Sequence, residues 1–315
     1  MNRNARKVVV VGAGSVGTSY IYALLQTGLA GEIALIDLDA QRVEGEVMDL
    51  SHGLPFVPPV SVKAGDYADC ADAHLIVITA GAKQTPGQSR TELIQKNADI
   101  IKSICGRIQA HDPTAVVLMV TNPVDTLTQV ALRCLSLPRT KVIGSGTVLD
   151  SARFKYLLSR HCEIDARNVH AYILGEHGDS EVPAWSMTHI AGIPIRKYCE
   201  ICHVCDYPEH HKEIAEQVRN SAYHIIDYKG STFYGIGLSL LRITGAILRN
   251  ERSVLTVSTY LEGEYGLNDI CLSVPCVVGE EGIERIIDAH LEPQEQEQLE
   301  GSAQVLRRVW EQVSL

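Results

Sequence analysis

A run of four valines followed by a glycine-rich turn constrains this chain more than any other feature. Residues 8–11 are all valine, and Gly12, Gly14 and Gly17 follow at once with the spacing G-x-G-x-x-G. β-Branched residues favour strands, and a helical pattern over residues 15–26 begins inside the glycine motif. A strand, a tight turn and a helix in this order are typical of the first unit of a doubly wound parallel α/β sheet.

The glycines in this turn predict a site for the phosphates of a dinucleotide. Gly12 permits the tight turn, Gly14 lets the backbone approach a pyrophosphate, and Gly17 lets helix and strand pack closely. The start of the helix supplies N–H donors and partial positive charge. Asp37 ends the next apolar strand, and its carboxylate can bind ribose hydroxyls but would repel a 2′-phosphate. The sequence therefore predicts NAD as the cofactor rather than NADP.

The pattern of elements changes near residue 145. Before that point, strands are expected at 7–11, 32–37, 74–79 and 115–120, alternating with helices at 15–26, 43–50 and 91–110. After it, helices at 149–160, at 213–228 and from about 295 are mixed with β-like segments at 169–174, 253–260 and 270–278. We expect a Rossmann-type NAD-binding domain (1–145) followed by an α+β substrate-binding and catalytic domain (146–315).

Composition excludes several other classes of protein. The 38 acidic residues against 28 Lys and Arg give a formal charge of −10, which argues against a general nucleic-acid binder. No run approaches the ~18 consecutive apolar residues of a membrane-spanning helix. Nine scattered cysteines fit a reducing compartment better than a disulfide framework. The basic start imitates a secretory leader, but three glycines interrupt its apolar core, so we expect a soluble cytoplasmic protein.

Five further segments place polar side chains after predicted strands or near helix ends, where ligands bind in open α/β sheets. They are residues 81–90, 121–125, 150–153, 175–179 and 229–232. Each segment alone has an ordinary structural explanation, such as a solvated ion pair, a glycine-rich turn or a Pro-Gly loop. Their joint order is much harder to explain in that way.

In this order the motifs resemble the lactate/malate dehydrogenase family over essentially the whole chain. The resemblance rests on residues 12–17, 48–50, 84–90, 121–125, 144–146, 149–153 and 175–180. It implies reversible hydride transfer between NADH and the C2 carbonyl of a small 2-oxo acid. It also implies a homotetramer, and with pyruvate as substrate the final step of lactate fermentation.

The resemblance also implies the reacting groups. His177 would carry the proton, because an imidazole pKa of ~6.5 allows either protonation state near neutrality. Asp150 would hold the other imidazole nitrogen and stabilise the imidazolium. Arg90, on a mobile loop, would polarise the carbonyl as negative charge develops there. Arg153 offers a planar fork that matches the substrate carboxylate.

Further residues are implied in binding the substrate and the cofactor. Gln84 matches the position that faces the group on C3, where family members acting on malate carry an arginine, so its uncharged amide favours pyruvate over oxaloacetate. Substrate contacts are also implied for Asn122, Asp125 and Thr232. Cofactor contacts are implied for Gly12, Gly14, Val16, Gly17, Asp37, Arg42, Tyr67, Gly81, Ala82, Thr121, Asn122 and Ser145.

The sequence does not decide whether the chain has an effector site. Many bacterial members of the family are activated by fructose 1,6-bisphosphate, which an arginine and a histidine bind between subunits. His170 matches the histidine, but Lys155 occupies the arginine position and lacks its bidentate geometry. A strand histidine at a subunit contact explains His170 about as well.

A cysteine cluster leaves a second question. Cys199, Cys202 and Cys205, with His210 and His211 nearby, have a spacing compatible with a zinc or iron–sulfur site. The family pattern gives no metal here, and reduced surface thiols are the plainer interpretation.

Two rival functions remain to be separated from this one. A malate or other 2-hydroxy-acid dehydrogenase is disfavoured by Gln84. A catalytically silent NAD-binding module would have no need to retain His177, Asp150, Arg90 and Arg153 together.

Overall fold

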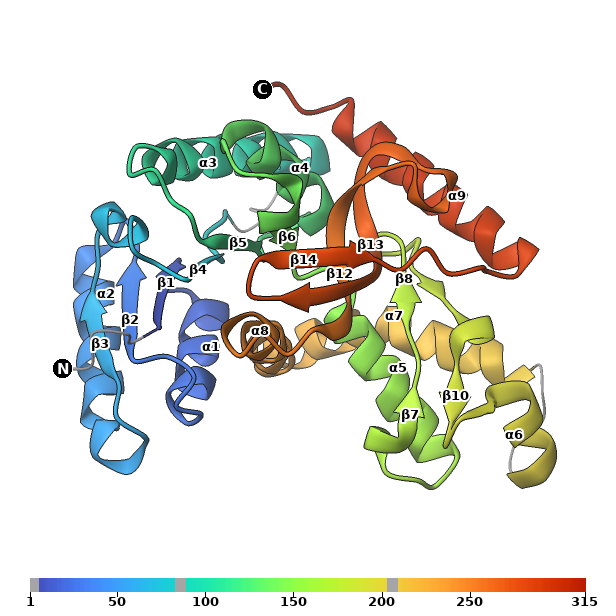
Figure 1. Cartoon of the computed structure of the whole chain (residues 1–315). Coiled ribbons are helices and arrows are strands. Elements are labelled where there is room, and N and C mark those ends of the chain that lie inside the picture. Colours follow the sequence, from blue (N-terminus) through green and yellow to red (C-terminus); the bar gives the residue numbers. More distant parts are fainter. Residues whose placement is uncertain (1–5, 83–88, 203–208) are drawn as a thin grey trace.

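The structure of the chain is a computed structural model that describes residues 6–82, 89–202 and 209–315. In the first half, strands alternate with helices (Figure 1). These elements are β1 (Lys7–Val11), α1 (Ser15–Leu25), β2 (Glu32–Ile36), α2 (Ala40–His52), β3 (Ser61–Ala64), β4 (Leu75–Ile78), α3 (Arg90–Gln109), β5 (Val116–Met119), α4 (Val124–Cys134) and β6 (Val142–Gly144). The strands pair in parallel in the order β3-β2-β1-β4-β5-β6, which confirms the doubly wound sheet.

The second half mixes helices with antiparallel strands. Its elements are α5 (Val148–His161), β7 (Val169–His170), β8 (Ile173–Leu174), β9 (Val182–Pro183), β10 (His189–Ile190), β11 (Ile193–Pro194), α6 (Ile195–Cys202), α7 (Glu209–Lys229), α8 (Tyr234–Leu248), β12 (Ser253–Glu262), β13 (Asn268–Gly279), β14 (Gly282–Ile286) and α9 (Pro293–Trp310). β12, β13 and β14 extend the parallel sheet beyond β6, because Ser258 of β12 pairs with Gly144. Within the described residues, one sheet of nine strands therefore runs through both halves.

The central strands are buried on both faces, as parallel strands covered by helices must be. Every residue of β1 and β4 is buried. Side chains alternate between the faces, so Val8 and Val10 join a core cluster with α1 and α8, while Val9 and Val11 join a second cluster with α3 and α4. The unbroken valine run thus contributes side chains to both core clusters.

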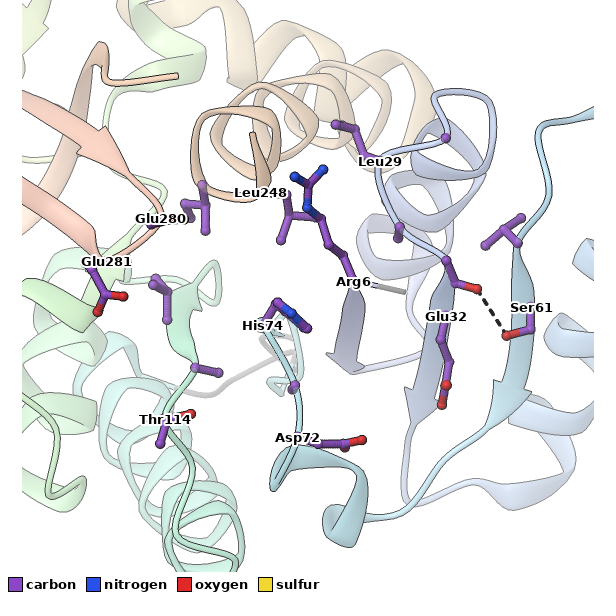
Figure 2. A pocket seen from close by; sticks show the side chains of 18 of the residues that line it. Arg6, Leu29, Glu32, Ser61, Asp72, His74, Thr114, Leu248, Glu280 and Glu281 are labelled. Atoms are coloured by element: carbon purple, nitrogen blue, oxygen red, sulfur yellow. Dashed lines mark hydrogen bonds between the residues drawn. The ribbon is translucent and has the colours of Figure 1, made fainter. Parts of the chain in front are cut away.

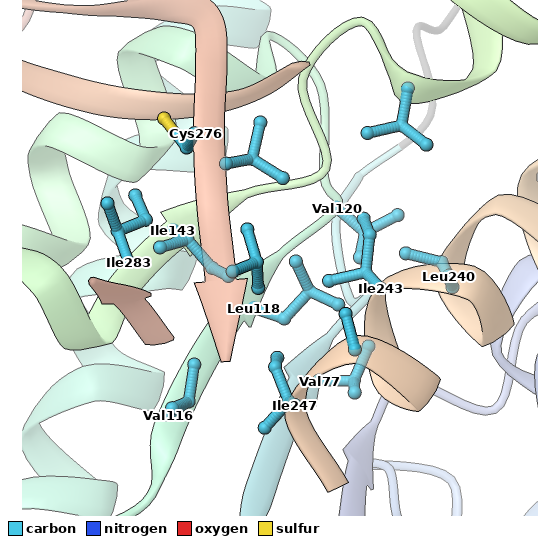
Figure 3. Packing of buried hydrophobic residues seen from close by; sticks show 14 of the residues in the cluster. Val77, Val116, Leu118, Val120, Ile143, Leu240, Ile243, Ile247, Cys276 and Ile283 are labelled. Atoms are coloured by element: carbon cyan, nitrogen blue, oxygen red, sulfur yellow. The ribbon is translucent and has the colours of Figure 1, made fainter. Parts of the chain in front are cut away.

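The two halves share the larger of these cores. Ile243 and Ile247 of α8 pack against the sheet face that carries Val77 and Leu118 (Figure 3). Ile283 of β14 belongs to the same cluster. The boundary expected near residue 145 falls between β6 and α5, but neither the sheet nor this core is interrupted there.

Some elements were not predicted from the sequence, or were predicted differently, for physical reasons. β3 is an edge strand whose residues are mostly exposed, so it lacks the apolar run by which the other strands were recognised. β6 contains three residues, too few for a periodic pattern. The expected segment 169–174 is divided into β7 and β8, which belong to different small sheets.

The described parts of the chain contain no helix that is both long and apolar enough to cross a membrane. Eight cysteines lie in these parts, and Cys70, Cys105, Cys134, Cys271 and Cys276 are free thiols.

Candidate active site

The carboxyl edge of the parallel strands gathers several of the predicted residues. Because the strands are parallel, the loops that follow β1, β4, β5 and β6 emerge at the same edge of the sheet. Gly12, Gly81, Thr121 and Ser145 lie in these four loops. The Thr121 hydroxyl donates to the Ala80 carbonyl at 2.7 Å and ties the second loop to the third.

The turn after β1 is shaped to hold a phosphate group. Gly12 has φ +119°, and a Cβ there would lie 2.5 Å from Oγ1 of Thr79. A Cβ at Gly17 would lie 2.1 Å from the Gly12 carbonyl oxygen. Within the described residues, in contrast, a Cβ at Gly14 would meet nothing within 4 Å, and no side chain caps the start of α1. The glycines therefore close the turn and leave open space beside uncapped helix N–H groups, which fits a pyrophosphate.

The residues implied for the nucleoside part lie beside this turn. Oδ2 of Asp37 accepts a hydrogen bond of 2.7 Å from the N–H of Ala13, so the carboxylate sits at the glycine motif. Arg42 is half-exposed on α2. Tyr67 is buried, with the Arg107 guanidinium 4.0 Å from its ring centre. These positions are compatible with a dinucleotide along the carboxyl edge.

Asn97 is a site residue that the sequence reasoning missed. It is 2% exposed on α3, where it accepts a hydrogen bond from the N–H of Ala82 and donates one to the carbonyl of Asn122. The Asn97 amide thus joins the loops after β4 and β5. A polar residue on a face shared with buried Ile94 and Ile101 was the available signal, since a buried amide needs partners.

His177, Asp150 and Arg153 are brought together in the second half of the chain. Nδ1 of His177 lies 2.5 Å from Oδ2 of Asp150, and Nη1 of Arg153 donates to Oδ1 of the same carboxylate at 2.6 Å. Asp150 is 2% exposed, whereas the His177 side chain keeps 25% of its surface accessible. A buried carboxylate therefore holds two functional groups in place while the imidazole remains reachable.

The charges of this cluster favour a protonated imidazole. Burial opposes it, but the charge and hydrogen bond of Asp150 outweigh burial and raise the pKa of His177 to about 9. Burial would also raise the pKa of Asp150, yet the charges of His177 and Arg153 hold it below its ordinary value. Near neutral pH the pair is therefore an imidazolium beside a carboxylate.

Asp125 connects this cluster to the nucleotide-binding edge. It lies in the first turn of α4, directly after the loop that follows β5, and is 2% exposed. Its Oδ2 accepts a hydrogen bond of 2.8 Å from the backbone N–H of His177. Burial raises the pKa of Asp125 to about 6. The loop that carries His177 is thus hydrogen-bonded to α4 at a position only three residues after Asn122.

The remaining predicted substrate residues are placed less completely. Gln84 lies outside the described residues, as does the side chain of Arg90, which begins α3. Asn122 is exposed after β5, and Thr232 is half-buried in the break between α7 and α8.

The sequence leaves an effector site at Lys155 and His170 undecided, and these two residues lie on neighbouring elements of the second half. Lys155 is half-buried on α5, 5.4 Å from the ring centre of Tyr172, and burial together with the charge of Arg242 lowers its pKa. His170 is exposed on β7, where it pairs with His189 of β10. A strand position for His170 agrees with the sequence pattern.

The cysteine segment differs from the sequence-based expectation. Cys199 is 5% exposed on α6 and packs in a core cluster with Phe154 and Ile195, so the surface-thiol interpretation is wrong for this residue. Cys205 lies outside the described residues. Among residues 6–82, 89–202 and 209–315, no group of three His, Cys, Asp or Glu side chains could hold a metal ion.

A groove of about 1250 Å³ opens at the opposite edge of the sheet, where the parallel strands begin (Figure 2). Its lining carries charges of both signs, from Arg6, Glu32, Lys141 and Glu281, and Lys141 pairs with Glu281 at 2.8 Å. None of the predicted catalytic, substrate or cofactor residues within the described ranges lines this groove. These predicted functional residues therefore lie at the carboxyl edge of the sheet and not in this groove.

Comparison with known proteins gives a consistent result over the whole length. The model of the lactate/malate dehydrogenase NAD binding domain matches residues 6–144, and that of the α/β C-terminal domain of the same family matches residues 147–314. The chain is 53% identical to an L-lactate dehydrogenase of Treponema denticola over 316 residues, covering 100% of both chains. It is 51% identical to one of Acetivibrio thermocellus over 308 residues, covering 98% of this chain and 97% of the other.

The solved structures of a minor L-lactate dehydrogenase from Enterococcus mundtii have the same fold. The ligand-bound form matches with a TM-score of 0.96 at 44% identity and 99% coverage of both chains. The ligand-free form matches with a TM-score of 0.92 at 43% identity, covering 100% of this chain and 99% of the other.

Proposed function

The chain belongs to the lactate/malate dehydrogenase family, and we propose that it is an NAD-dependent L-lactate dehydrogenase that interconverts pyruvate and L-lactate. The observation that carries this proposal is the His177–Asp150 pair fastened through Asp125 to the carboxyl edge of the nucleotide-binding sheet. Residues 1–145 bind the cofactor in this proposal, and residues 146–315 contribute the substrate site.

The glycine turn and Asp37 hold the cofactor. Open space at Gly14 and the uncapped N-terminus of α1 accommodate the pyrophosphate, while Asp37 faces the ribose. When bound, NADH supplies the hydride that no amino-acid side chain can provide. Val16, Arg42, Tyr67, Gly81, Ala82, Thr121, Asn122 and Ser145 line the remainder of the cofactor site.

His177 donates the proton during pyruvate reduction. The raised pKa keeps the imidazole protonated near neutrality, so it can protonate the carbonyl oxygen as hydride reaches C2. Asp150 stabilises the imidazolium and fixes the ring through Nδ1, which leaves Nε2 to face the substrate. In lactate oxidation the neutral imidazole takes the hydroxyl proton back.

Arg153 binds the substrate carboxylate. Among the described residues, only its Nη1 is engaged, by Asp150, and the rest of the planar fork is free for a second carboxylate. Arg90 polarises the carbonyl, and Asn122 and Thr232 contact the substrate. Asp125, which the resemblance implies as a further substrate contact, also has a positioning role, because its buried carboxylate accepts the backbone N–H of His177.

Gln84 selects the substrate. An uncharged amide next to the C3 group accepts the methyl group of pyruvate and offers no partner to the second carboxylate of oxaloacetate. With pyruvate as substrate, the reaction is the final step of lactate fermentation, following glycolysis.

Assembly and location follow the family. We expect a homotetramer in the cytoplasm, and the assembly is supported by exposed apolar side chains on α1 and α8, among them Tyr22 (64% exposed) and Leu238 (61%). Fructose 1,6-bisphosphate activation through Lys155 and His170 is tested by titrating that compound while pyruvate saturation is measured. No change in apparent affinity means that no such site operates.

The function is tested by following NADH absorbance with pyruvate, oxaloacetate and larger 2-oxo acids. We expect the highest kcat/KM with pyruvate, and a loss of roughly 10²–10⁴-fold in His177→Gln, in which proton transfer is removed. A preference for oxaloacetate would identify a malate dehydrogenase instead. NADH binding without turnover of any 2-oxo acid would identify a silent NAD-binding module.

A further inference from the structure

A second buried acid lies in the loop that carries His177, and the proposed mechanism does not use it. Residues 175–181 connect β8 to β9, whose pairing of Leu174 with Val182 closes the loop. Glu181 is the last residue of this loop and is 5% exposed. Its Oε1 has no hydrogen-bond partner among the described residues. A buried carboxyl oxygen without a hydrogen-bond partner is costly, so its presence here calls for an electrostatic explanation.

The charges of groups from three elements act on Glu181. His177 lies in its own loop, Asp150 and Arg153 come from α5, and Arg219 comes from α7. Nε of Arg219 is also buried without a hydrogen-bond partner in the described part of the chain. Three cationic groups and one other carboxylate thus act on Glu181, and an ionised Glu181 lowers the net positive charge of this group.

Other acids near the imidazole are already engaged. Asp125 on α4 accepts the backbone N–H of His177, and Glu176 accepts the Ser180 hydroxyl at 2.6 Å. Asp179, in the same loop, is exposed and accepts a hydrogen bond of 2.7 Å from the hydroxyl of Tyr223. Glu181 is therefore the acid of this group whose charge is least satisfied by hydrogen bonds.

We propose that Glu181, balanced by Arg219, is a positioning residue for the charge of His177, and that its ionised carboxylate stabilises the imidazolium that protonates the substrate. This inference rests on the proposed function for its catalytic consequence. The electrostatic link itself concerns only groups of this chain and exists without cofactor or substrate.

The sign of the effect follows from reciprocity. Burial raises the pKa of Glu181, the charge of Asp150 adds to this, and His177 and Arg219 oppose it, leaving a value of about 8. Since protonated His177 favours the ionised form of Glu181, ionised Glu181 must favour protonated His177 equally. Above pH 8 the carboxylate therefore delays loss of the imidazole proton. Glu181 thereby extends the pH range over which pyruvate is reduced.

The catalytic test compares pH profiles of kcat/KM for pyruvate reduction in the wild type and Glu181→Gln. We expect similar values at pH 6, a midpoint of the basic limb that is lower by about half a unit to one unit in the variant, and roughly 3–10-fold less activity at pH 9. Glu181→Asp retains a carboxylate and should recover part of the shift. Asp179→Asn removes an exposed charge from the same loop and should leave the midpoint in place.

A second measurement does not need turnover. In cofactor-free protein with ¹³C-labelled histidine, the signal that disappears in His177→Gln identifies His177. In the wild type, the titration curve of His177 should contain a second inflection from Glu181. In Glu181→Gln, His177 should titrate in a single step at lower pH. Single-step titration of the wild type, or identical midpoints in both proteins, would overturn the proposal. Absence of pyruvate reduction by the wild type would contradict the proposed function, and the histidine titration would still decide this inference.

Discussion

The backbone N–H of His177 donates a hydrogen bond of 2.8 Å to Oδ2 of Asp125, and this bond crosses between the two halves of the chain. Asp125 lies in the first turn of a helix of the nucleotide-binding half, whereas His177 lies in a loop of the other half. The bond thus sets where the imidazole lies relative to the cofactor edge, which matters because small displacements of a reacting group are costly in rate.

Replacing Asp125 should therefore affect both activity and stability. Asp125→Ala leaves a buried N–H without an acceptor, which costs about 1–3 kcal/mol of unfolding free energy. The displaced imidazole should lower kcat/KM by roughly 10²-fold. Asp125→Asn keeps an oxygen acceptor and should lose less of both. Urea unfolding and steady-state kinetics check this, and equal behaviour of Asp125→Ala and wild type would contradict it.

Removing the partner of His177 should shift the pH dependence strongly. In Asp150→Asn the imidazole loses the charge that raises its pKa to about 9, while burial, which lowers the pKa, remains. Because reduction needs the protonated form, its basic limb should fall by two units or more. The kcat/KM profile between pH 5 and 10 measures this, and an unmoved limb would show that Asp150 does not set the imidazole charge.

Arg153→Lys should separate charge from geometry. Lysine keeps a positive charge beside Asp150 but loses the planar fork that binds a second carboxylate. We expect a loss of about 2 kcal/mol in transition-state binding, or roughly 30-fold in kcat/KM for pyruvate. Arg160→Lys, an exposed change on the same helix, is the control. Equal kinetics of both variants would argue against carboxylate binding by Arg153.

Gly14→Ala should weaken cofactor binding without unfolding the protein. The added Cβ meets no atom of residues 6–82, 89–202 or 209–315 within 4 Å, yet it occupies the space assigned to the pyrophosphate. We expect the Kd for NADH to rise about tenfold or more, ~1.4 kcal/mol, with an unchanged melting temperature. Gly45→Ala on α2 also adds a Cβ to open space and should leave Kd unaltered. Titration of NADH fluorescence distinguishes the two.

Gln84→Arg should change the preferred substrate. A guanidinium group at this position pairs with the second carboxylate of oxaloacetate and is left without an anion when pyruvate binds. The ratio of kcat/KM for oxaloacetate to that for pyruvate should rise at least about 100-fold. Gln88→Arg adds the same charge to the same segment as a control. An unchanged ratio would remove Gln84 from the specificity argument.

Much of the nucleotide-binding half could be predicted because its determinants are local. The valine run and the spacing of Gly12, Gly14 and Gly17 specify strand, turn and helix through backbone sterics and burial on both faces. The sequence order of the motifs also led to the family. β3 escaped prediction because an exposed edge strand carries no apolar pattern.

Only the tertiary structure decided which charged groups that are far apart in the sequence lie close enough in space to interact. Asp125, Asp150 and His177 lie far apart along the chain, and their charges interact because α4, α5 and the β8–β9 loop pack together. Glu181 has no sequence feature that separates it from the many exposed acids. Its burial separates it, as does the lack of a hydrogen-bond partner for Oε1 within the described part of the chain. Patterns along a chain report backbone preference and amphipathicity, whereas burial and the proximity of charges depend on packing between segments.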